Sequence, residues 1–188
     1  MNIKIDRELL INPLGNVAGI VEKRHALPIL SNLLLENQEG NLKFTATDLE
    51  MQISTQIKTK LSDDFQITIS AKKLFDITRA LPEKSNIDIQ IEENKVTVKA
   101  KKSRFNLVTL PPKDYPVMKK DIDDVIKLKL SQNILKNLLK QVDFSMAQQD
   151  IRYYLNGLLI EIKDNNLNIV GTDGHRLSFT STALKDPC

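Results

Sequence analysis

The stretch Ile29-Leu30-Ser31-Asn32-Leu33-Leu34-Leu35-Glu36 returns later in the chain as Tyr154-Leu155-Asn156-Gly157-Leu158-Leu159-Ile160-Glu161. The offset of 125 positions continues without a gap, so that Thr47-Asp48 returns as Thr172-Asp173. A repeat of this length indicates tandem copies of one domain and not a solenoid of short units. The sequence therefore predicts a first domain followed by a second copy of its beginning.

The second copy ends halfway, because Cys188 corresponds to Asp63 of the first copy. We therefore expect either that the protein continues beyond this chain or that the chain is a fragment. The predicted domains are a complete first domain over residues 1–120, and a linker with the first half of a second domain over 121–188. The proline-rich and charged residues 111–116 and 119–121 have the composition of an interdomain linker.

The composition is that of an ordinary globular protein, with 41% hydrophobic and 27% charged residues. The apolar runs are too short to span a bilayer, and the N-terminus lacks the apolar core of a secretory signal. We therefore expect no membrane association and a cytoplasmic location. A single cysteine excludes an intrachain disulfide, and with only two histidines no zinc site of the usual type is expected. We expect no metal and no cofactor.

A fainter repeat divides the chain into three segments near residues 1–63, 64–125 and 126–188. Each segment begins with a short alternating strand and continues with apolar residues at helical spacing. The three strands are Ile3-Lys4-Ile5-Asp6, Ile67-Thr68-Ile69-Ser70 and Leu128-Lys129-Leu130-Ser131. Their last residues, Asp6, Ser70 and Ser131, are predicted to cap the helices that follow. Pro13 predicts a kink in the first helix or a later start.

Three alternating strands follow each of the first two helices. We expect them at residues 29–37, 41–48 and 51–60, and again at 86–92, 95–101 and 104–110. Two segments of the form strand–helix–strand–strand–strand therefore make one domain. Such a pattern favours an α+β fold in which the helices lie on one side and antiparallel sheets on the other.

Several longer motifs resemble those of the bacterial DNA polymerase III beta sliding clamp family. They lie at residues 27–35, 47–51, 144–147, 150–157 and 172–177, and the resemblance extends over the whole chain. It implies the DNA clamp fold, with helices facing a DNA lumen, antiparallel sheets outside, and three tandem domains per subunit. It also implies a head-to-tail homodimeric ring around duplex DNA, whose partners are the polymerase III alpha subunit, clamp-loader subunits, other polymerases and repair proteins.

The candidates for DNA contact are Arg24, Arg79, Gln149, Tyr153 and Tyr154. Arg24 and Gln149 are repeat mates, and the resemblance implies that both touch DNA phosphates from equivalent loops. Arg79 lies on a predicted helix whose basic surface is also explained by solubility alone. The two tyrosines adjoin Arg152, and such aromatic residues can stack on single-stranded bases. Strand alternation, however, predicts that at least one of them packs in the core.

The run Thr172-Asp173-Gly174-His175-Arg176 admits two interpretations. The spacing of Asp173 and His175 suggests a dyad or a metal site, but no nucleophile elbow and no second histidine at ligand spacing accompany it. The repeat mate Thr47-Asp48 predicts instead that the shared Thr-Asp builds a turn through the carboxylate. The resemblance implies one wall of a pocket for short, partly hydrophobic peptides, formed by Leu155, Thr172, Gly174, His175, Arg176 and Leu177.

The predicted strand with Arg104-Phe105-Asn106-Leu107 carries a further candidate site. Alternation places Phe105 and Leu107 on one face, where an ordinary core position is a strong explanation. The resemblance implies that they instead meet the third domain of a partner subunit, with Lys73, Ile77 and Arg104 nearby. Such a contact is heterologous, so its angle decides whether a ring closes.

The sequence favours a non-catalytic processivity clamp that tethers the replicative polymerase and slides on double-stranded DNA without sequence preference. The modest net charge of +3 suits sliding, because tight phosphate contacts would hold the ring in place. No Gly-x-x-x-x-Gly-Lys loop occurs, so ATP-driven loading would need a partner. Two other classes stay open, namely a tandem-domain peptide-binding adaptor that does not encircle DNA and an enzyme that uses Asp173 and His175.

Overall fold

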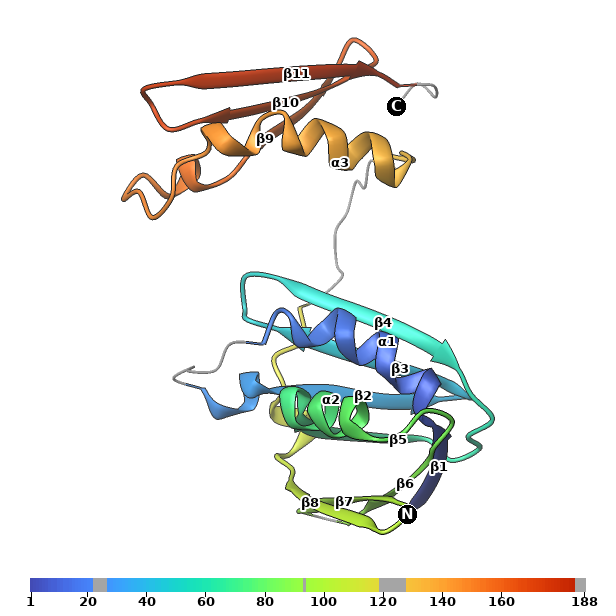
Figure 1. Ribbon diagram of the computed structural model, residues 1–188. Helices are drawn as coiled ribbons and strands as arrows, with labels where there is room; N and C mark the ends of the chain where they lie inside the picture. Colours follow the sequence, from blue (N-terminus) through green and yellow to red (C-terminus); the bar gives the residue numbers. More distant parts are fainter. Residues whose placement is uncertain (22–26, 93, 119–127, 185–188) are drawn as a thin grey trace. The chain divides into compact units, whose positions relative to one another are not determined.

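The computed structural model describes residues 1–21, 27–92, 94–118 and 128–184. The chain divides into two compact units, a first unit Met1–Lys120 and a second unit Asp121–Cys188 (Figure 1). The elements of the first unit are β1 (Asn2–Asp6), α1 (Arg7–Ala18), η1 (Pro28–Ser31), β2 (Asn32–Gln38), β3 (Asn41–Thr47), β4 (Gln52–Lys58), β5 (Phe65–Ser70), α2 (Ala71–Ala80), β6 (Asn86–Ile91), β7 (Lys95–Ala100), β8 (Ser103–Val108) and η2 (Pro112–Asp114). Those of the second unit are α3 (Gln132–Lys140), η3 (Asp143–Ser145), η4 (Tyr153–Asn156), β9 (Leu159–Lys163), β10 (Asn166–Thr172) and β11 (Leu177–Ala183).

The two halves of the first unit exchange their first strands. The sheets run β4-β3-β2-β5 and β8-β7-β6-β1, and every neighbouring pair is antiparallel. Thus β1 lies beside β6 of the second half, with Ile5 opposite Ile87, while β5 lies beside β2 of the first half, with Leu35 opposite Ile67. The predicted order of strands and helices is confirmed for the first unit, but the sequence pattern did not predict the exchange. The strand predicted at residues 128–131 of the second unit is not formed.

The core of the first unit lies between these sheets and the helix pair α1 and α2, which lie side by side in Figure 1. Helix α1 buries Leu10, Leu14 and Val17 completely, at the i, i+4 and i+7 spacing of one helical face. Gly15 lies against α2, since a Cβ there would come within 3.6 Å of the Phe75 ring. The two helices therefore pack against each other at Gly15 with room for a methyl group in ordinary van der Waals contact.

The predicted caps are correctly placed, but only one of them bonds through its side chain. Asp6, Ser70 and Ser131 all occupy N-cap positions, and only the Ser131 hydroxyl accepts a hydrogen bond, from the Ile134 amide at 3.3 Å. Helix α1 begins directly after Asp6 with Pro13 inside it, so the predicted late start is wrong.

The prediction of a linker over residues 111–116 is also wrong, because this segment packs on the first unit. It contains the short helix η2, and the Tyr115 side chain is buried. The Tyr115 hydroxyl donates toward the carbonyl oxygens of Asn32 at 3.2 Å and Thr45 at 3.4 Å. Burial raises the pKa of Tyr115 to about 12. The rest of the predicted linker, residues 119–121, lies outside the described residues.

The second unit repeats the first half of the first unit from the helix onward: α3, η4, β9, β10 and β11 correspond to α1, η1, β2, β3 and β4. Strands β10 and β11 have the lengths of β3 and β4 at the same offset of 125 positions, and η4 corresponds to η1 in the same way. The strand predicted over residues 29–37 therefore begins only at Asn32, because the residues before it form the 3-10 helix η1. The second copy has the 3-10 helix η4 at the corresponding place. The sheet of the second unit runs β11-β10-β9, which leaves β9 at its edge within the described residues.

Gly171 lies where the backbone of β10 packs tightly against the Val142 carbonyl. A Cβ at this position would collide with the Val142 carbonyl oxygen, although the equivalent residue of the first unit is Ala46. We expect Gly171→Ala to destabilise the second unit by about 1–3 kcal/mol, because the helix end or the strand must move. Urea unfolding followed by the β10 amide signals in NMR spectra measures the change.

The matched control is Gly157→Ala, because a Cβ there meets nothing within 4 Å and the backbone φ of −131° suits any residue. Equal unfolding midpoints for the two variants would contradict this description of the packing.

Candidate functional site

A cleft in the second unit brings together the segment after α3 and the turn between β10 and β11. It encloses about 620 Å³. Its lining consists of polar and charged side chains with three apolar ones, namely Phe144, Met146, Ala147, Gln148, Gln149, Asp150, Arg152, Asp173, His175 and Arg176. The sequence motifs at residues 144–147, 150–157 and 172–177 thus meet in one place.

Hydrogen bonds made by the side chains of Thr172 and Asp173 close the turn between β10 and β11. The Thr172 hydroxyl donates to the Arg176 carbonyl at 2.7 Å and accepts from the Gly174 amide at 3.1 Å. The Asp173 carboxylate accepts from the amides of His175 and Arg176, both at 2.9 Å, and from Arg176 Nε at 2.9 Å. Gly174 has a φ of +87°, which a glycine adopts without strain.

The first unit builds the same turn between β3 and β4. Thr47 donates to the Met51 carbonyl at 2.6 Å, and the Asp48 carboxylate accepts from the amides of Glu50 and Met51 at 3.0 and 2.7 Å. Leu49 occupies the glycine position with a φ of +79°, a conformation that costs energy for a residue with a side chain. The prediction that the shared Thr-Asp is structural is therefore confirmed.

Arg152, in the loop before η4, joins that loop to the turn between β10 and β11. Its guanidinium donates to both carboxylate oxygens of Asp150, at 3.1 and 2.9 Å, and reaches the Asp173 carbonyl at 3.4 Å. A Cβ on Gly174 would come within 3.2 Å of the same guanidinium. Asn156 closes the other side of the loop, because its side chain exchanges two hydrogen bonds with the Asp150 backbone.

These contacts favour the ionised form of both carboxyl groups. The Arg152 side chain is the largest cause that lowers the pKa of Asp150 to about 2, followed by the Arg152 backbone amide. For Asp173, the backbone amides of His175 and Arg176 come first and lower the pKa to about 2. The two carboxylates thus order the rim of the cleft at neutral pH.

Sequence analysis did not name Asp150, Arg152 and Phe144 as site residues. The Asp150-Ile151-Arg152 spacing offered a signal for the first two, because opposite charges two residues apart pair readily in a turn. Phe144 contacts the site through the Arg176 guanidinium, whose central carbon lies 5.9 Å from the ring centroid. No local pattern indicates that contact, because the two residues meet only after the sheet forms.

The structure places the six predicted pocket residues around the turn and the adjoining helix η4. Thr172 and Gly174 build the turn, while His175 and Arg176 line the cleft. Leu155 is buried and its carbonyl accepts from the Ala147 amide at 3.0 Å, whereas Leu177 is exposed at the start of β11. An exposed apolar side chain beside an ordered polar rim suits the recognition of a peptide.

Of the five predicted DNA contacts, three lie near the cleft. Gln149 lines it, and Tyr153 and Tyr154 lie on η4 with their rings edge to face, 6.0 Å between centroids. The tyrosines are 83% and 67% exposed, so the expectation that one of them packs in the core is wrong. Arg79 lies on α2 and pairs with Asp76 at 3.5 Å, and Arg24 lies outside the described residues.

The predicted dimer residues lie on α2 and β8 of the first unit. Lys73 and Arg104 are exposed, while Ile77 and Phe105 are half-buried and pack against the core. Leu107 is only 7% exposed and belongs to the core. A contact of Leu107 with a partner subunit stays a prediction, because the side chain packs within the core of the unit and also lines a hollow on its surface together with Lys73.

The alternative enzymatic interpretation receives no support from the turn geometry. The Asp173 carboxylate is engaged by two backbone amides and by Arg176, and the His175 side chain is exposed. Within the described residues, no group of three or more His, Cys, Asp or Glu side chains is placed to hold a metal ion. No helix in the described part of the chain is long and apolar enough to cross a membrane.

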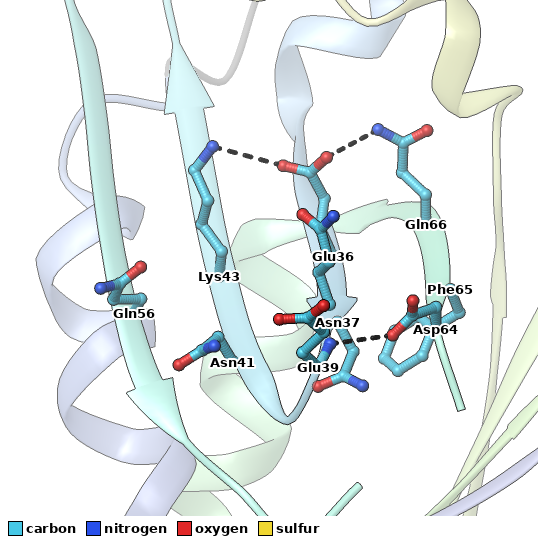
Figure 2. Close-up of a pocket in the computed structure, with 10 residues that line it drawn as sticks. Glu36, Asn37, Glu39, Asn41, Lys43, Gln56, Asp64, Phe65 and Gln66 are labelled. Atoms are coloured by element: carbon cyan, nitrogen blue, oxygen red, sulfur yellow. Dashed lines mark hydrogen bonds and ion pairs between the residues drawn. The ribbon is translucent and has the colours of Figure 1, made fainter. Parts of the chain in front are cut away.

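A second hollow lies on the first unit, between the ends of β2, β3 and β5 (Figure 2). Its polar groups bond to one another, since Glu36 pairs with Lys43 at 3.5 Å and accepts from the Gln66 amide at 2.7 Å. The Asp64 carboxylate accepts from the Glu39 backbone amide at 2.9 Å. These pairs explain the hollow as a cross-strand polar network.

Comparison with known proteins identifies relatives for both units. Residues 1–119 match the family described as "DNA polymerase III beta subunit, N-terminal domain", and residues 129–187 match its central domain. A beta sliding clamp from Pseudomonas putida is 44% identical over 182 residues, which cover 96% of this chain and 49% of the relative. The beta sliding clamp of Escherichia coli K12 is 42% identical over 185 residues, covering 98% and 50%. The chain thus spans about half the length of these relatives.

Solved structures agree with these sequence relatives. The DNA polymerase III subunit beta of Pseudomonas aeruginosa matches with a TM-score of 0.94 and 42% identity, over 100% of this chain and 51% of that one. Caulobacter crescentus pol III beta matches with a TM-score of 0.91 and 35% identity, over 100% and 53%. The expected clamp fold is therefore confirmed.

The two lowered pKa values make the rim of the cleft sensitive to acid. A carboxyl whose pKa is about 2 in the folded protein, against an ordinary 3.8, contributes stability that is present above about pH 4 and is lost as the pH falls toward 2. We expect carboxyl carbon shifts in NMR spectra to report midpoints near 2 for both groups.

Two variants separate the causes. Arg152→Gln should raise the pKa of Asp150 most of the way to its ordinary value, because the Arg152 side chain is the main cause of the shift. Arg176→Gln should leave the pKa of Asp173 low, because backbone amides dominate there. Midpoints near 3.8 in the unmodified chain would contradict this description of the rim.

Proposed function

Because the chain belongs to the DNA polymerase III beta subunit family, we propose that it forms the N-terminal and central-domain part of a replication processivity clamp. The whole protein closes as a homodimeric ring around duplex DNA and slides along it in the cytoplasm. It tethers the replicative polymerase and performs no catalysis itself. The carrying observation is that both units match the family separately, in sequence and in fold.

The helix surface of the first unit supports loose contact with DNA. Lys72, Lys73 and Arg79 are exposed on α2, and Arg79 shares its charge with Asp76 through an ion pair. Each phosphate that a protein neutralises adds salt-dependent affinity, so a few shared charges favour a lumen that holds DNA weakly. Arg24 would add a contact from its loop.

The second unit supplies the proposed contacts to single-stranded DNA and to partner peptides. Tyr153 and Tyr154 present exposed rings beside Arg152, an arrangement that suits stacking on bases. The pocket wall formed by Leu155, Thr172, Gly174, His175, Arg176 and Leu177 accepts short, partly hydrophobic motifs. Such motifs would come from the polymerase alpha subunit, clamp-loader subunits, other polymerases and repair proteins.

The rigid turn explains why this wall can act as a peptide site. Five hydrogen bonds through the side chains of Thr172, Asp173 and Arg176 fix residues 172–176 before any ligand arrives. A site that is ordered in advance loses less conformational entropy on binding. The copy in the first unit has the same turn but carries Leu49 and Glu50 in place of Gly174 and His175, so we assign peptide recognition to the second unit.

The proposed ring interface uses α2 and β8 of the first unit. Lys73 and Arg104 offer exposed charges, and Ile77 and Phe105 are half-buried beside them. Leu107 would lie beneath this surface, because its side chain is already enclosed by the core of the unit. Strand β8 lies at the edge of its sheet within the described residues, so its backbone groups are free to pair with another strand.

Retention on DNA circles tests the proposal against a peptide-binding adaptor that does not encircle DNA. A chimera would join the 188 residues to the remaining half of the Pseudomonas aeruginosa clamp and be loaded by a clamp loader on nicked circular DNA. We expect the chimera to stay on the circle through gel filtration and to leave when the DNA is linearised, because a topological link needs no tight contact.

The 188-residue chain alone serves as the control and should not be retained. Equal retention of the chimera on circular and linear DNA would show binding by contact and would refute the clamp proposal.

A further inference from the structure

The chain contains a single Asn-Gly pair, Asn156-Gly157, which lies at the end of η4. Asparagine followed by glycine is chemically reactive, because the backbone nitrogen of the glycine can attack the side-chain carbonyl carbon, Cγ, of the asparagine. Glycine has no side chain to hinder this approach and leaves the backbone free to rotate. The pair is therefore a candidate for spontaneous deamidation, in which the side-chain amide becomes an acid.

The first unit forms the same local structure without this reactive pair. The counterparts of Asn156 and Gly157, 125 positions earlier, are Ser31 and Asn32. Ser31 ends η1 as Asn156 ends η4, and its hydroxyl donates to the Pro28 carbonyl at 2.7 Å. The 3-10 helix therefore does not require Asn-Gly, and the pair sets the second unit apart from the first.

The backbone at Gly157 is open to the attack. A Cβ on Gly157 would meet nothing within 4 Å, so no neighbouring atom crowds this residue. Within the described residues, the Gly157 amide donates no backbone hydrogen bond at the end of η4. The attacking nitrogen is thus not held by another acceptor.

The Asn156 side chain closes the loop of residues 147–156. Its Nδ2 donates to the Asp150 carbonyl oxygen at 3.0 Å, and its Oδ1 accepts from the Asp150 amide at 2.9 Å. The Ala147 amide donates to the Leu155 carbonyl at 3.0 Å and completes the closure. The closure needs a carboxamide, because an ionised carboxylate has no proton to donate.

Asp150 transmits this constraint to the cleft. Its carboxylate accepts from the Arg152 backbone amide at 2.8 Å and from the Arg152 guanidinium at 3.1 and 2.9 Å. The same guanidinium reaches the Asp173 carbonyl at 3.4 Å. Asn156 therefore holds Arg152 against the turn between β10 and β11 through Asp150, although Asn156 does not itself line the cleft.

We propose that Asn156 is a deamidation site, and that its conversion to an acid opens the loop and releases Arg152 from the turn. A bond forms between the Gly157 nitrogen and Asn156 Cγ, the Cγ–Nδ2 bond breaks, and ammonia leaves with the proton of the Gly157 amide. Water then adds to the cyclic imide and breaks either the new bond, which gives aspartate, or the original peptide bond, which gives isoaspartate. No ligand of the cleft takes part, so this reaction is independent of the proposed function.

Both products lose the closure of the loop. At neutral pH the acid offers only acceptors, so an oxygen faces the Asp150 carbonyl oxygen where a donor is needed. Isoaspartate also inserts the side-chain methylene into the backbone before Gly157. The Asp150 backbone is then no longer held, and its ion pair with Arg152 no longer fixes the turn. The change is one-way, because ammonia is lost.

The same hydrogen bonds control the rate of the reaction. They hold the side-chain amide of Asn156 against the Asp150 backbone, so the attack requires the loop to open locally. Arg152→Gln removes the bonds that steady Asp150 and leaves the Asn-Gly pair itself unchanged. We expect this variant to deamidate at least about threefold faster than the unmodified chain.

Peptide mass spectrometry of the 188-residue chain, incubated at mildly alkaline pH, tests the modification. We expect Asn156 to convert before any other asparagine, at a rate that rises with pH because hydroxide removes the Gly157 amide proton. Gly157→Ala should slow the conversion at least about tenfold because a methyl group hinders the attack, although the extended backbone there suits alanine.

Three outcomes of this experiment would overturn the proposal. They are an Asn156 that stays intact while other asparagines convert, an equal rate in Gly157→Ala, and a rate in Arg152→Gln that is no higher than in the unmodified chain.

The Arg152 Nε–H signal in NMR spectra tests the consequence for the cleft. Asn156→Asp has the composition of the aspartate product and should remove the shift that the bond to Asp150 gives this signal. Asn166→Asp is the matched control, because Asn166 also donates through Nδ2 to a backbone carbonyl, that of Asp164 at 3.0 Å, but at the start of β10. It should leave the Arg152 signal unchanged. The same Arg152 signal in Asn156→Asp as in the unmodified chain would contradict the release of Arg152.

Discussion

The structure of the first unit depends on the reciprocal exchange of β1 and β5 between its halves. Each half places its helix over a sheet that is incomplete without a strand from the other half. The core residues Ile5 and Ile69 reach their positions only through this exchange. The halves are therefore expected to fold as one cooperative body, with the two helices side by side on a common core.

The same local turn serves two purposes in the two units. Thr47 with Asp48, and Thr172 with Asp173, close matching turns through matching hydrogen bonds. In the second unit, glycine at the third position relieves the backbone strain and admits the Arg152 guanidinium beside it. The Asp173 carboxylate fixes the turn itself, and the Asp150 carboxylate holds Arg152, whose guanidinium reaches the Asp173 carbonyl.

The sequence predicted what depends on local pattern. Strand alternation and helical spacing located most elements, and the internal repeat showed that Thr-Asp is structural. Pairing between distant strands has no local signal, so the crossing of β1 and β5 was not predicted. The prolines around Tyr115 predict a linker, and only the folded unit brings the Tyr115 hydroxyl to the carbonyl oxygens of Asn32 and Thr45. The spacing of Asp150 and Arg152 indicates their ion pair, but only the fold brings Arg152 to the Asp173 carbonyl in a separate turn.

Amide hydrogen exchange at increasing denaturant concentration tests the central constraint most directly. The 188-residue chain would be followed residue by residue, with β1 and β5 as the informative strands. We expect the amides of both strands to become exchangeable in the same transition as those of β2 and β6, because each half completes the sheet of the other. Release of β1 in a separate transition at lower denaturant, with β5 still protected, would contradict the reciprocal dependence of the two halves.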